Sequence, residues 1–216
     1  QQTVWLAWPH NTSTWPNRFA PIPECFRQII GLIAEFIPVN VIGDPSLRNA
    51  ARVDPISNVR WIDIATNDCW IRDYGPTFVV DDGGEHYAID WAYNAWGGKY
   101  APWDADDRAT AQIIRQAGWR RVAGSLCLEG GALEWDGRGR LLTTSNCLIT
   151  PTRNPGRRRE QVESELRELA GAVEILWVDG GGLAGDDTDG HIDQLARFVD
   201  PQTVVAATCD PSDSEN

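Results

Sequence analysis

Acidic side chains recur in three short segments of the sequence, and the last segment also contains a histidine. The segments are NDCWIRD at 67–73, LEGG at 128–131 and DDTDGHID at 186–193. Carboxylates can bind a guanidinium group through paired hydrogen bonds, because this planar cation stays charged at neutral pH. Carboxylates and an imidazole can also bind a divalent metal ion. The two interpretations predict different chemistry.

The metal interpretation finds little support in the spacing of these residues. If Gly190 takes the place of the invariant glycine of an EF-hand loop, Gly185 falls where an aspartate is required. Ala196 then falls where the loop needs a bidentate glutamate. We therefore predict no metal site and no other cofactor, and a metal-binding module remains an alternative without a complete ligand set.

The guanidinium interpretation predicts a particular chemistry. The charge of a guanidinium is delocalised, so its central carbon is a poor electrophile. Attack there requires a strong nucleophile, groups that localise the charge, and an acid that protonates the departing ammonia. A thiolate, flanking carboxylates and a histidine supply these three functions.

The acidic segments recur at similar places in three sequence units. Helical spacing of apolar residues predicts helices over 23–37, 105–117 and 158–170, each followed by a short β-branched run at 39–42, 119–122 or 173–178. Each acidic segment precedes two apolar runs divided by a hairpin signal, at 82–84, 136–137 and 200–201. Units arranged around an axis would bring equivalent segments together. We therefore expect an acidic pocket that contains Asp73, Glu129, His191 and Asp193.

Composition narrows the classes of function. The formal net charge of −12 disfavours nucleic acid and anionic membranes as partners, because both require a basic surface. The most apolar stretch, 29–39, is too short to span a bilayer. Five cysteines without a C-x-x-C pair argue against a zinc knuckle and a disulfide framework. A cytoplasmic location is therefore expected.

Both ends of the sequence lead us to expect a fragment of a longer protein. It contains no methionine and begins directly with a strand-like run at 3–8. Residues 210–216 resemble the capped start of a helix that does not continue. We expect residues 1–216 to form a single catalytic domain that is truncated at both ends.

Several blocks of the sequence resemble the agmatine deiminase family. The blocks are WLAWPHN at 5–11, NDCWIRDYGPT at 67–77, DWAYNAWGGKY at 90–100, LEGG at 128–131, Cys147-Leu148 with Arg153-Asn154-Pro155, and 185–193. The resemblance implies an α/β pseudo-symmetric propeller of the pentein type, with about three of its five ββαβ units present. It also implies hydrolysis of agmatine, a small cationic substrate, to N-carbamoylputrescine and ammonia, a step of putrescine and polyamine biosynthesis. A homo-oligomer is compatible with it.

The resemblance also implies roles for individual residues. Asp73 and Asp193 match the carboxylates that bind the guanidinium, and His191 matches the general acid and base. Glu129 resembles an acidic pocket residue and Trp70 a wall of the substrate slot. The resemblance places Asp187 where it would meet the amine end of agmatine.

One feature departs from the family pattern. The family's nucleophilic cysteine lies in a C-terminal glycine-rich His-Cys segment, which is absent from this sequence. Cys147 matches a cysteine remote from the chemistry, and Cys69 lies where the family usually has a small polar residue. Cys25, Cys127 and Cys209 are expected in the core. We therefore expect this stretch to form part of the pocket without turning over agmatine.

Two other functions remain alternatives. A bacterial peptidylarginine deiminase would share the same core residues, although the 186–191 stretch and the block at 93–100 favour agmatine. The second alternative is a non-catalytic module that binds guanidino compounds or polyamines. The basic residues Arg153 and 157–159 precede the third predicted helix, and we interpret them as a solvated surface.

Overall fold

The computed structural model describes residues 2–178, 183, 185–208 and 212, which form a mixed α/β fold. Its first sheet is parallel, in the order β1 (Val4–Ala7), β2 (Val39–Gly43) and β3 (Val59–Asp63). Helix α1 (Ile22–Ala34) connects β1 to β2 and begins with a proline in its first turn. Parallel neighbouring strands need such a crossover connection, because a tight turn would make the second strand run antiparallel to the first.

The second and third sheets share one topology. In the second, β4 (Thr77–Val80) pairs antiparallel with β5 (His86–Ala92), and helix α5 (Asp104–Ala117) leads to β6 (Arg120–Cys127), which runs parallel to β5. In the third, β7 (Glu134–Trp135), β8 (Arg140–Thr144), helix α7 (Arg159–Ala170) and β9 (Glu174–Val178) repeat this order. A further hairpin pairs β10 (Ala196–Asp200) with β11 (Thr203–Ala206).

The three predicted helices are confirmed, with small differences at their ends. Helix α1 stops at Ala34, three residues before the predicted end, because Pro38 follows and the preceding residues turn out of the helix. Helices α5 and α7 end at the left-handed glycines Gly118 and Gly171, which terminate a helix at low cost. The predicted strand runs after all three helices are also confirmed, as β2, β6 and β9.

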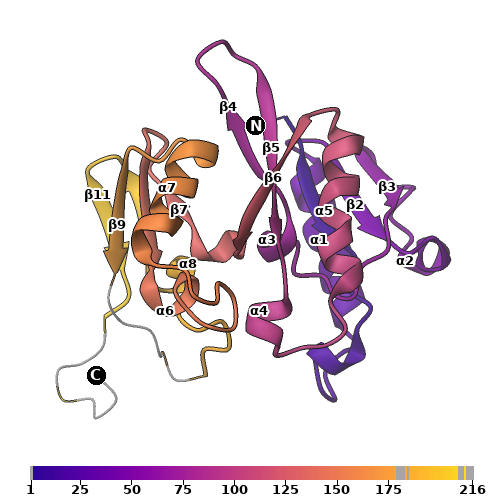
Figure 1. Cartoon of the computed structure of the whole chain (residues 1–216). Helices are drawn as coiled ribbons and strands as arrows, with labels where there is room; N and C mark the ends of the chain where they lie inside the picture. Colours follow the sequence, from indigo (N-terminus) through magenta and orange to yellow (C-terminus); the bar gives the residue numbers. More distant parts are fainter. Residues whose placement is uncertain (1, 179–182, 184, 209–211, 213–216) are drawn as a thin grey trace.

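The helices and sheets are held together by buried apolar side chains. Val162 and Leu166 of α7 are fully buried in one cluster with Leu126 of β6 and Leu141 of β8. Helix α7 thereby joins the second sheet to the third. Complete burial of such a side chain stabilises the fold by roughly 1.5–3 kcal/mol. Figure 1 shows the first sheet with α1 on one side of the molecule and the third sheet with α7 on the other.

Short helical turns connect these elements. They are α2 (Arg48–Ala51), α3 (Ile71–Tyr74), α4 (Ala95–Gly98), α6 (Ser145–Leu148) and α8 (Ile192–Leu195), with 3-10 turns at Thr12–Thr14, Pro45–Leu47 and Gly130–Ala132. Helix α3, the 130–132 turn and α8 each lie in or beside one of the three acidic segments. The 130–132 turn packs against both α3 and α8, so the three segments meet in space.

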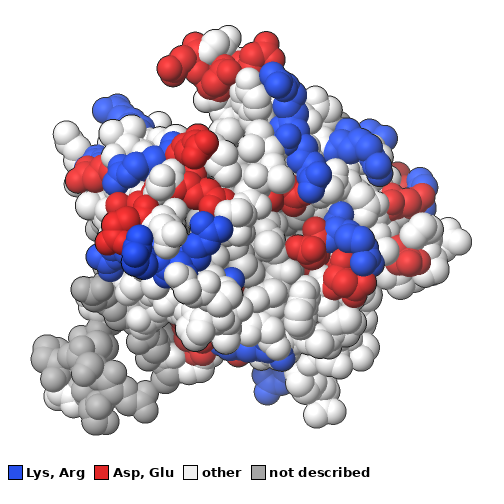
Figure 2. Space-filling view, viewed as in Figure 1, with Lys and Arg blue, Asp and Glu red and all other residues white. Residues whose placement is uncertain are grey.

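The surface bears charges of both signs. On the face seen in Figure 2, clusters of Lys and Arg lie beside clusters of Asp and Glu. This face therefore presents no continuous basic surface of the kind that nucleic acid requires. Among the described residues, no helix has both the length and the apolarity needed to cross a membrane.

Candidate functional site

A cavity of about 1220 Å³ opens where the acidic segments meet. Its wall includes five residues that the sequence predicted for the site: Trp70, Asp73, Asp187, His191 and Asp193. Glu129, the sixth, is completely buried and lies next to His191 without being part of the wall. The expected convergence is therefore observed for these residues, but Glu129 lies beneath the pocket surface.

Asp73 is held by donors on both of its carboxylate oxygens. The backbone N–H of Gly131 donates to Oδ1 at 3.0 Å, and Nε1 of Trp96 donates to Oδ2 at 3.0 Å. Burial raises the pKa of this carboxyl, although His191 and the two donors act in the opposite direction. Both oxygens thus have fixed orientations at the cavity wall.

Gly131 permits this close packing because it has no side chain. A Cβ atom at this position would lie 2.4 Å from Nδ1 of His191 and 2.7 Å from Oδ1 of Asp73. Both distances are shorter than any ordinary contact. The second glycine of the LEGG segment is therefore required for Asp73 and His191 to approach each other.

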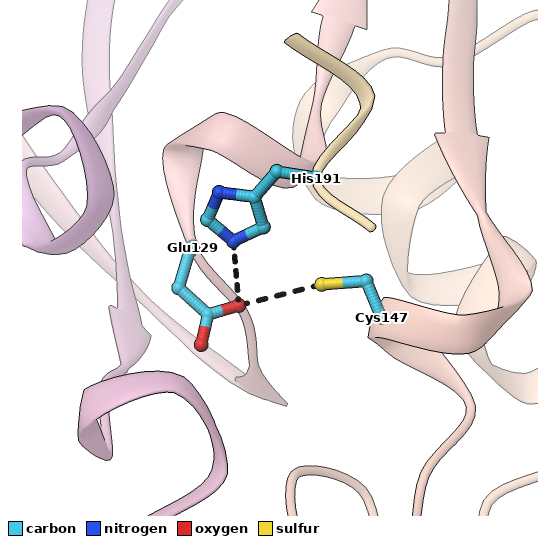
Figure 3. A group of neighbouring side chains, drawn as sticks. All are labelled: Glu129, Cys147 and His191. Atoms are coloured by element: carbon cyan, nitrogen blue, oxygen red, sulfur yellow. Dashed lines mark hydrogen bonds and ion pairs between the residues drawn. The ribbon is translucent and has the colours of Figure 1, made fainter. Parts of the chain in front are cut away.

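His191 lies between two carboxylates. Its Nδ1 is 3.7 Å from Oδ1 of Asp73, and its Nε2 is 3.5 Å from Oε2 of Glu129 (Figure 3). Because 3.5 Å is long for a hydrogen bond, the buried Nε2 atom has no well-formed hydrogen bond. Burial acts to lower the pKa of this imidazole, but Glu129, Asp73 and Asp193 outweigh it and raise the pKa above its ordinary value. The site therefore favours the protonated form, which is able to donate a proton.

Glu129 is surrounded by three polar side chains. Nε of Arg153 donates to both carboxylate oxygens, at 2.8 and 2.9 Å, and Sγ of Cys147 donates to Oε2 at 3.6 Å (Figure 3). Burial opposes ionisation of Glu129, but His191 and Arg153 overcome it and lower the pKa of the carboxyl. Glu129 is consequently a buried anion stabilised by a buried cation.

These neighbours bear on the metal alternative. One ligand atom each of Glu129, Cys147 and His191 lies within 4.8 Å of the others, a donor set that suits zinc. However, both oxygens of Glu129 already accept from the guanidinium of Arg153. A metal ion would have to bind beside that buried cation or displace it. The charge balance of the cluster therefore disfavours a metal.

Asp193 also lines the cavity and is partly exposed. Its Oδ2 lies 3.6 Å from Nε of Arg72, whose Nη2 also donates to the carbonyl oxygen of Leu133 at 3.2 Å. The contact neutralises Asp193 only in part, because both side chains reach solvent. Asp193 is thus able to accept hydrogen bonds from a second cation in the cavity.

The rim of the cavity is formed by aromatic and charged side chains. Trp70 is 42% exposed and stacks on Trp15, with 6.0 Å between the ring centroids. Asp187 is exposed and accepts a hydrogen bond from the hydroxyl of Tyr100. Nζ of Lys99 donates to the backbone carbonyl of Asp187 at 2.7 Å. Asp187 therefore lies at the rim, but its carboxylate already has a partner.

Two interpretations of the sequence are wrong, those of Arg153 and Cys25. Arg153 is completely buried rather than solvated, because it pairs with Glu129. Cys147 does not line the cavity, although its thiol contacts that same buried carboxylate. Cys25 is exposed on α1 and is not part of the core.

The buried cysteines are poor candidates for the nucleophile. Burial raises the pKa of Cys69, Cys127 and Cys147, and nearby carboxylates raise it further. For Cys127 the pKa rises to about 12. Cys209 lies outside the described residues. None of the four described cysteines belongs to the cavity wall.

One residue that orients Asp73, Trp96, was not predicted from the sequence. Trp96 lies in α4, where Ala95 and Trp96 adopt positive φ angles of 51° and 57°, followed by two glycines with positive φ. Such backbone is unfavourable for residues with a side chain. Asn94 stabilises it by accepting from Gly97 N–H at 2.9 Å. The consecutive glycines were the available signal for an unusual turn.

Known proteins resemble this chain along its whole length. Residues 1–216 match the model of the Porphyromonas-type peptidyl-arginine deiminase family. The agmatine deiminase of Stutzerimonas stutzeri (strain A1501) is 39% identical over 222 residues, which cover 99% of this chain and 59% of that protein. That of Ectopseudomonas mendocina (strain ymp) is 38% identical over 220 residues, with the same coverage, 99% and 59%.

A solved structure agrees with these sequence relatives. It is described as the agmatine deiminase of Enterococcus faecalis catalysing its reaction, and it superposes with a TM-score of 0.89 at 32% identity. The match covers 98% of this chain and 59% of that one. The chain therefore spans less than two thirds of the length of these relatives.

Proposed function

The chain belongs to the Porphyromonas-type peptidyl-arginine deiminase family, and from this premise we propose that its cavity binds the guanidinium group of agmatine for hydrolytic deimination. The observation that carries the proposal is the placement of Asp73, His191 and Asp193 on the wall of one cavity. Two carboxylates can bind the planar cation from two sides, while the imidazole lies beside it. The products would be N-carbamoylputrescine and ammonia.

Asp73 and Asp193 would bind different edges of the guanidinium group. Asp73, fixed by Trp96 and Gly131, accepts hydrogen bonds from one edge of the guanidinium. Asp193 accepts from a second edge. The indole of Trp70 lies exposed at the rim and would cover the alkyl chain of the substrate. The amine would then reach the region of Asp187 and Tyr100.

The reaction would proceed through a covalent intermediate on cysteine. A thiolate attacks the central carbon, and the C–N bond to one terminal nitrogen breaks as protonated His191 delivers a proton and ammonia leaves. Neutral His191 then removes one proton from a water molecule whose oxygen attacks the same carbon. The C–S bond breaks to release the thiolate, and the second proton of that water passes to solvent as the carbonyl of the product forms. Asp73 and Asp193 hold the charge in place during both steps.

The thiolate has to come from residues other than the four cysteines that the structure describes. Cys69, Cys127 and Cys147 are buried and have raised pKa values, and exposed Cys25 lies on α1, away from the cavity wall. We therefore assign the described residues to substrate binding and proton transfer. We assign no role in covalent catalysis to any of these four thiols.

The remaining features of the proposal concern organisation and setting. The shared topology of the second and third sheets supports a pseudo-symmetric pentein propeller, in which residues 1–216 form part of one catalytic domain. Agmatine hydrolysis of this kind would contribute to putrescine and polyamine biosynthesis. A cytoplasmic location is part of the proposal, and the free thiols of the described cysteines suit a reducing compartment.

Deimination of peptidyl-arginine is the second candidate, because it gives the matching family its name. Agmatine ends in an amine and free arginine carries an α-carboxylate, whereas within a peptide that carboxylate is replaced by an uncharged amide. These substrates therefore differ at the end proposed to face Asp187. An acidic rim would bind an amine and repel a carboxylate. The exposed carboxylate of Asp187 therefore favours agmatine over free arginine.

The proposal can be tested by calorimetric titration of the purified protein with agmatine, butylguanidine and putrescine. We expect agmatine and butylguanidine to bind, and putrescine to bind much more weakly because it lacks the guanidinium. Asp73→Asn and Asp193→Asn should each abolish measurable binding. Asp90→Asn should not, because it alters an ion pair between the buried Asp90 and the exposed Arg121 outside the cavity wall. Equal affinity for putrescine would contradict the proposal, and ammonia release from arginine or an arginyl peptide would identify the substrate.

A further inference from the structure

Arg153 connects two parts of the site that belong to different segments of the chain. Its side chain is completely buried, as is that of Glu129, to which its Nε donates. Its Nη1 donates to Oδ2 of Asp189 at 2.8 Å, and its Nη2 donates to the carbonyl oxygen of Thr188 at 3.0 Å. The guanidinium therefore uses all three nitrogens to join Glu129 to the segment just before His191.

The 186–190 segment that Arg153 contacts determines where His191 lies. Oδ1 of Asp186 accepts from Thr188 N–H at 2.8 Å, and its Oδ2 accepts from Gly190 N–H at 2.5 Å. The hydroxyl of Thr144 donates to the carbonyl of Gly190 at 2.7 Å. Asp189 has a positive φ of 65°, an unfavourable conformation that needs support from its surroundings. Arg153 supplies such support through its bond to the Asp189 side chain.

Arg153 is also the nearest buried cation to Glu129. The groups that face this carboxylate are Arg153, the Cys147 thiol and the His191 imidazole. Asp189 shares the guanidinium and also pairs with Lys99 at the surface. A chain of alternating charges thus runs from His191 through Glu129, Arg153 and Asp189 to Lys99. Removing Arg153 would leave Glu129 as a buried anion without its cation, a state that favours protonation.

We propose that Arg153 is a positioning residue, whose guanidinium holds the carboxylate of Glu129 against His191 and fixes the turn that carries His191. The inference rests on the proposed function for the part that His191 plays in the reaction. It does not require Arg153 to touch substrate, because Arg153 is absent from the described cavity wall. An ion pair that only stabilised the fold would leave the titration of His191 unchanged.

The test is a pH titration of the His191 resonance by NMR, with ¹³C-labelled histidine and a His191→Gln variant for assignment. We expect Arg153→Met to lower the pKa of His191, because Glu129 takes up a proton and no longer stabilises the imidazolium. In that background, adding Glu129→Gln should change the His191 pKa little, whereas Glu129→Gln alone should lower it. Arg140→Met provides a matched control, since Arg140 bonds the fully buried Asp136 side chain in a hairpin away from the cavity wall.

A second variant, Asp189→Asn, tests the inference even if Arg153→Met does not fold. Asp189→Asn keeps Arg153 and Glu129 but removes one charge from the link, at a side chain that is 38% exposed. We expect faster amide exchange at 188–191 in this variant. A separate variant, Arg153→Lys, keeps the positive charge, so its His191 pKa should lie between the values of the native protein and of Arg153→Met. An unchanged His191 pKa in folded Arg153→Met would overturn the inference. Because these readouts need no substrate, failure of agmatine binding would instead count against the proposed function.

Discussion

Nε1 of Trp96 donates a 3.0 Å hydrogen bond to Oδ2 of Asp73, from a turn whose backbone is held in the left-handed region. The bond satisfies one carboxylate oxygen and leaves the orientation of Asp73 fixed at the cavity wall. Gly131 N–H acts on the other oxygen. The unfavourable backbone conformation of α4 thus positions one hydrogen-bond donor, the indole N–H of Trp96, in the site.

Replacement of Trp96 by phenylalanine should weaken agmatine binding by roughly 10- to 150-fold, because a hydrogen bond to a charged group contributes roughly 1.5–3 kcal/mol. Calorimetric titration of the two proteins measures this difference. Trp177→Phe is the matched control, since Nε1 of Trp177 also donates to a carboxylate, that of Glu163 at 2.8 Å, outside the cavity wall. Equal losses in the two variants would show that the Trp96 effect is not specific to Asp73.

Substitution of Gly131 by alanine should abolish agmatine binding. The added methyl would occupy space within 2.7 Å of both His191 and Asp73, so one of them must move. Gly31→Ala is the control, because open space surrounds that position on α1 and alanine favours a helix by about 1 kcal/mol over glycine. Binding assays and thermal unfolding of both variants would test this. A Gly131→Ala protein with native affinity would contradict the packing described for the site.

The stability of the fold should depend on His191 in a particular pH range. Its pKa is raised in the folded state, so its contacts with Glu129 and Asp73 stabilise the protein fully below the ordinary histidine pKa of about 6.5. This contribution is lost as the pH rises through the folded-state value. The stability advantage of the native protein over His191→Gln should therefore shrink as the pH is raised above about 6.5. Urea unfolding of both proteins across this range gives the answer, and a constant or growing advantage would contradict it.

The cysteines should differ sharply in reactivity. Cys25 is exposed, whereas Cys69, Cys127 and Cys147 are buried. Iodoacetamide should therefore modify Cys25 first among these four, as peptide mass spectrometry would show, without reducing affinity for agmatine. Cys69→Ser should likewise retain binding and any ammonia release. Loss of release in that variant alone would identify Cys69 as the nucleophile and overturn the assignment made above.

Much of the fold could be predicted from local patterns. The spacing of Ile30, Ile113 and Leu166 with their apolar neighbours located the three long helices, and the Asp-Gly pair at 136–137 marked a hairpin. These signals are read within a few residues of sequence. The recurrence of acidic segments beside such units also led to Asp73, His191 and Asp193, which line one cavity. Their chemical roles remain predictions.

Other features depended on contacts between distant residues and could not be read locally. Arg153 lies near other arginines in the sequence, and this local pattern is typical of a charged surface. In the structure Arg153 is buried, because it forms an ion pair with Glu129, which lies 24 positions away in the sequence. The same carboxylate brings Cys147 into the cluster. The positive φ of Trp96 has no sequence signal of its own apart from the glycines that follow. In each case tertiary structure, rather than local propensity, determined the environment.

The most direct measurement is a crystal structure of the protein with bound agmatine. The account predicts that the guanidinium lies between Asp73 and Asp193, within hydrogen-bond distance of both carboxylates, with the ring of His191 beside it. The alkyl chain should pass Trp70 toward Asp187. A guanidinium bound elsewhere, or an agmatine molecule in this cavity with its amine at Asp73, would contradict the central claim.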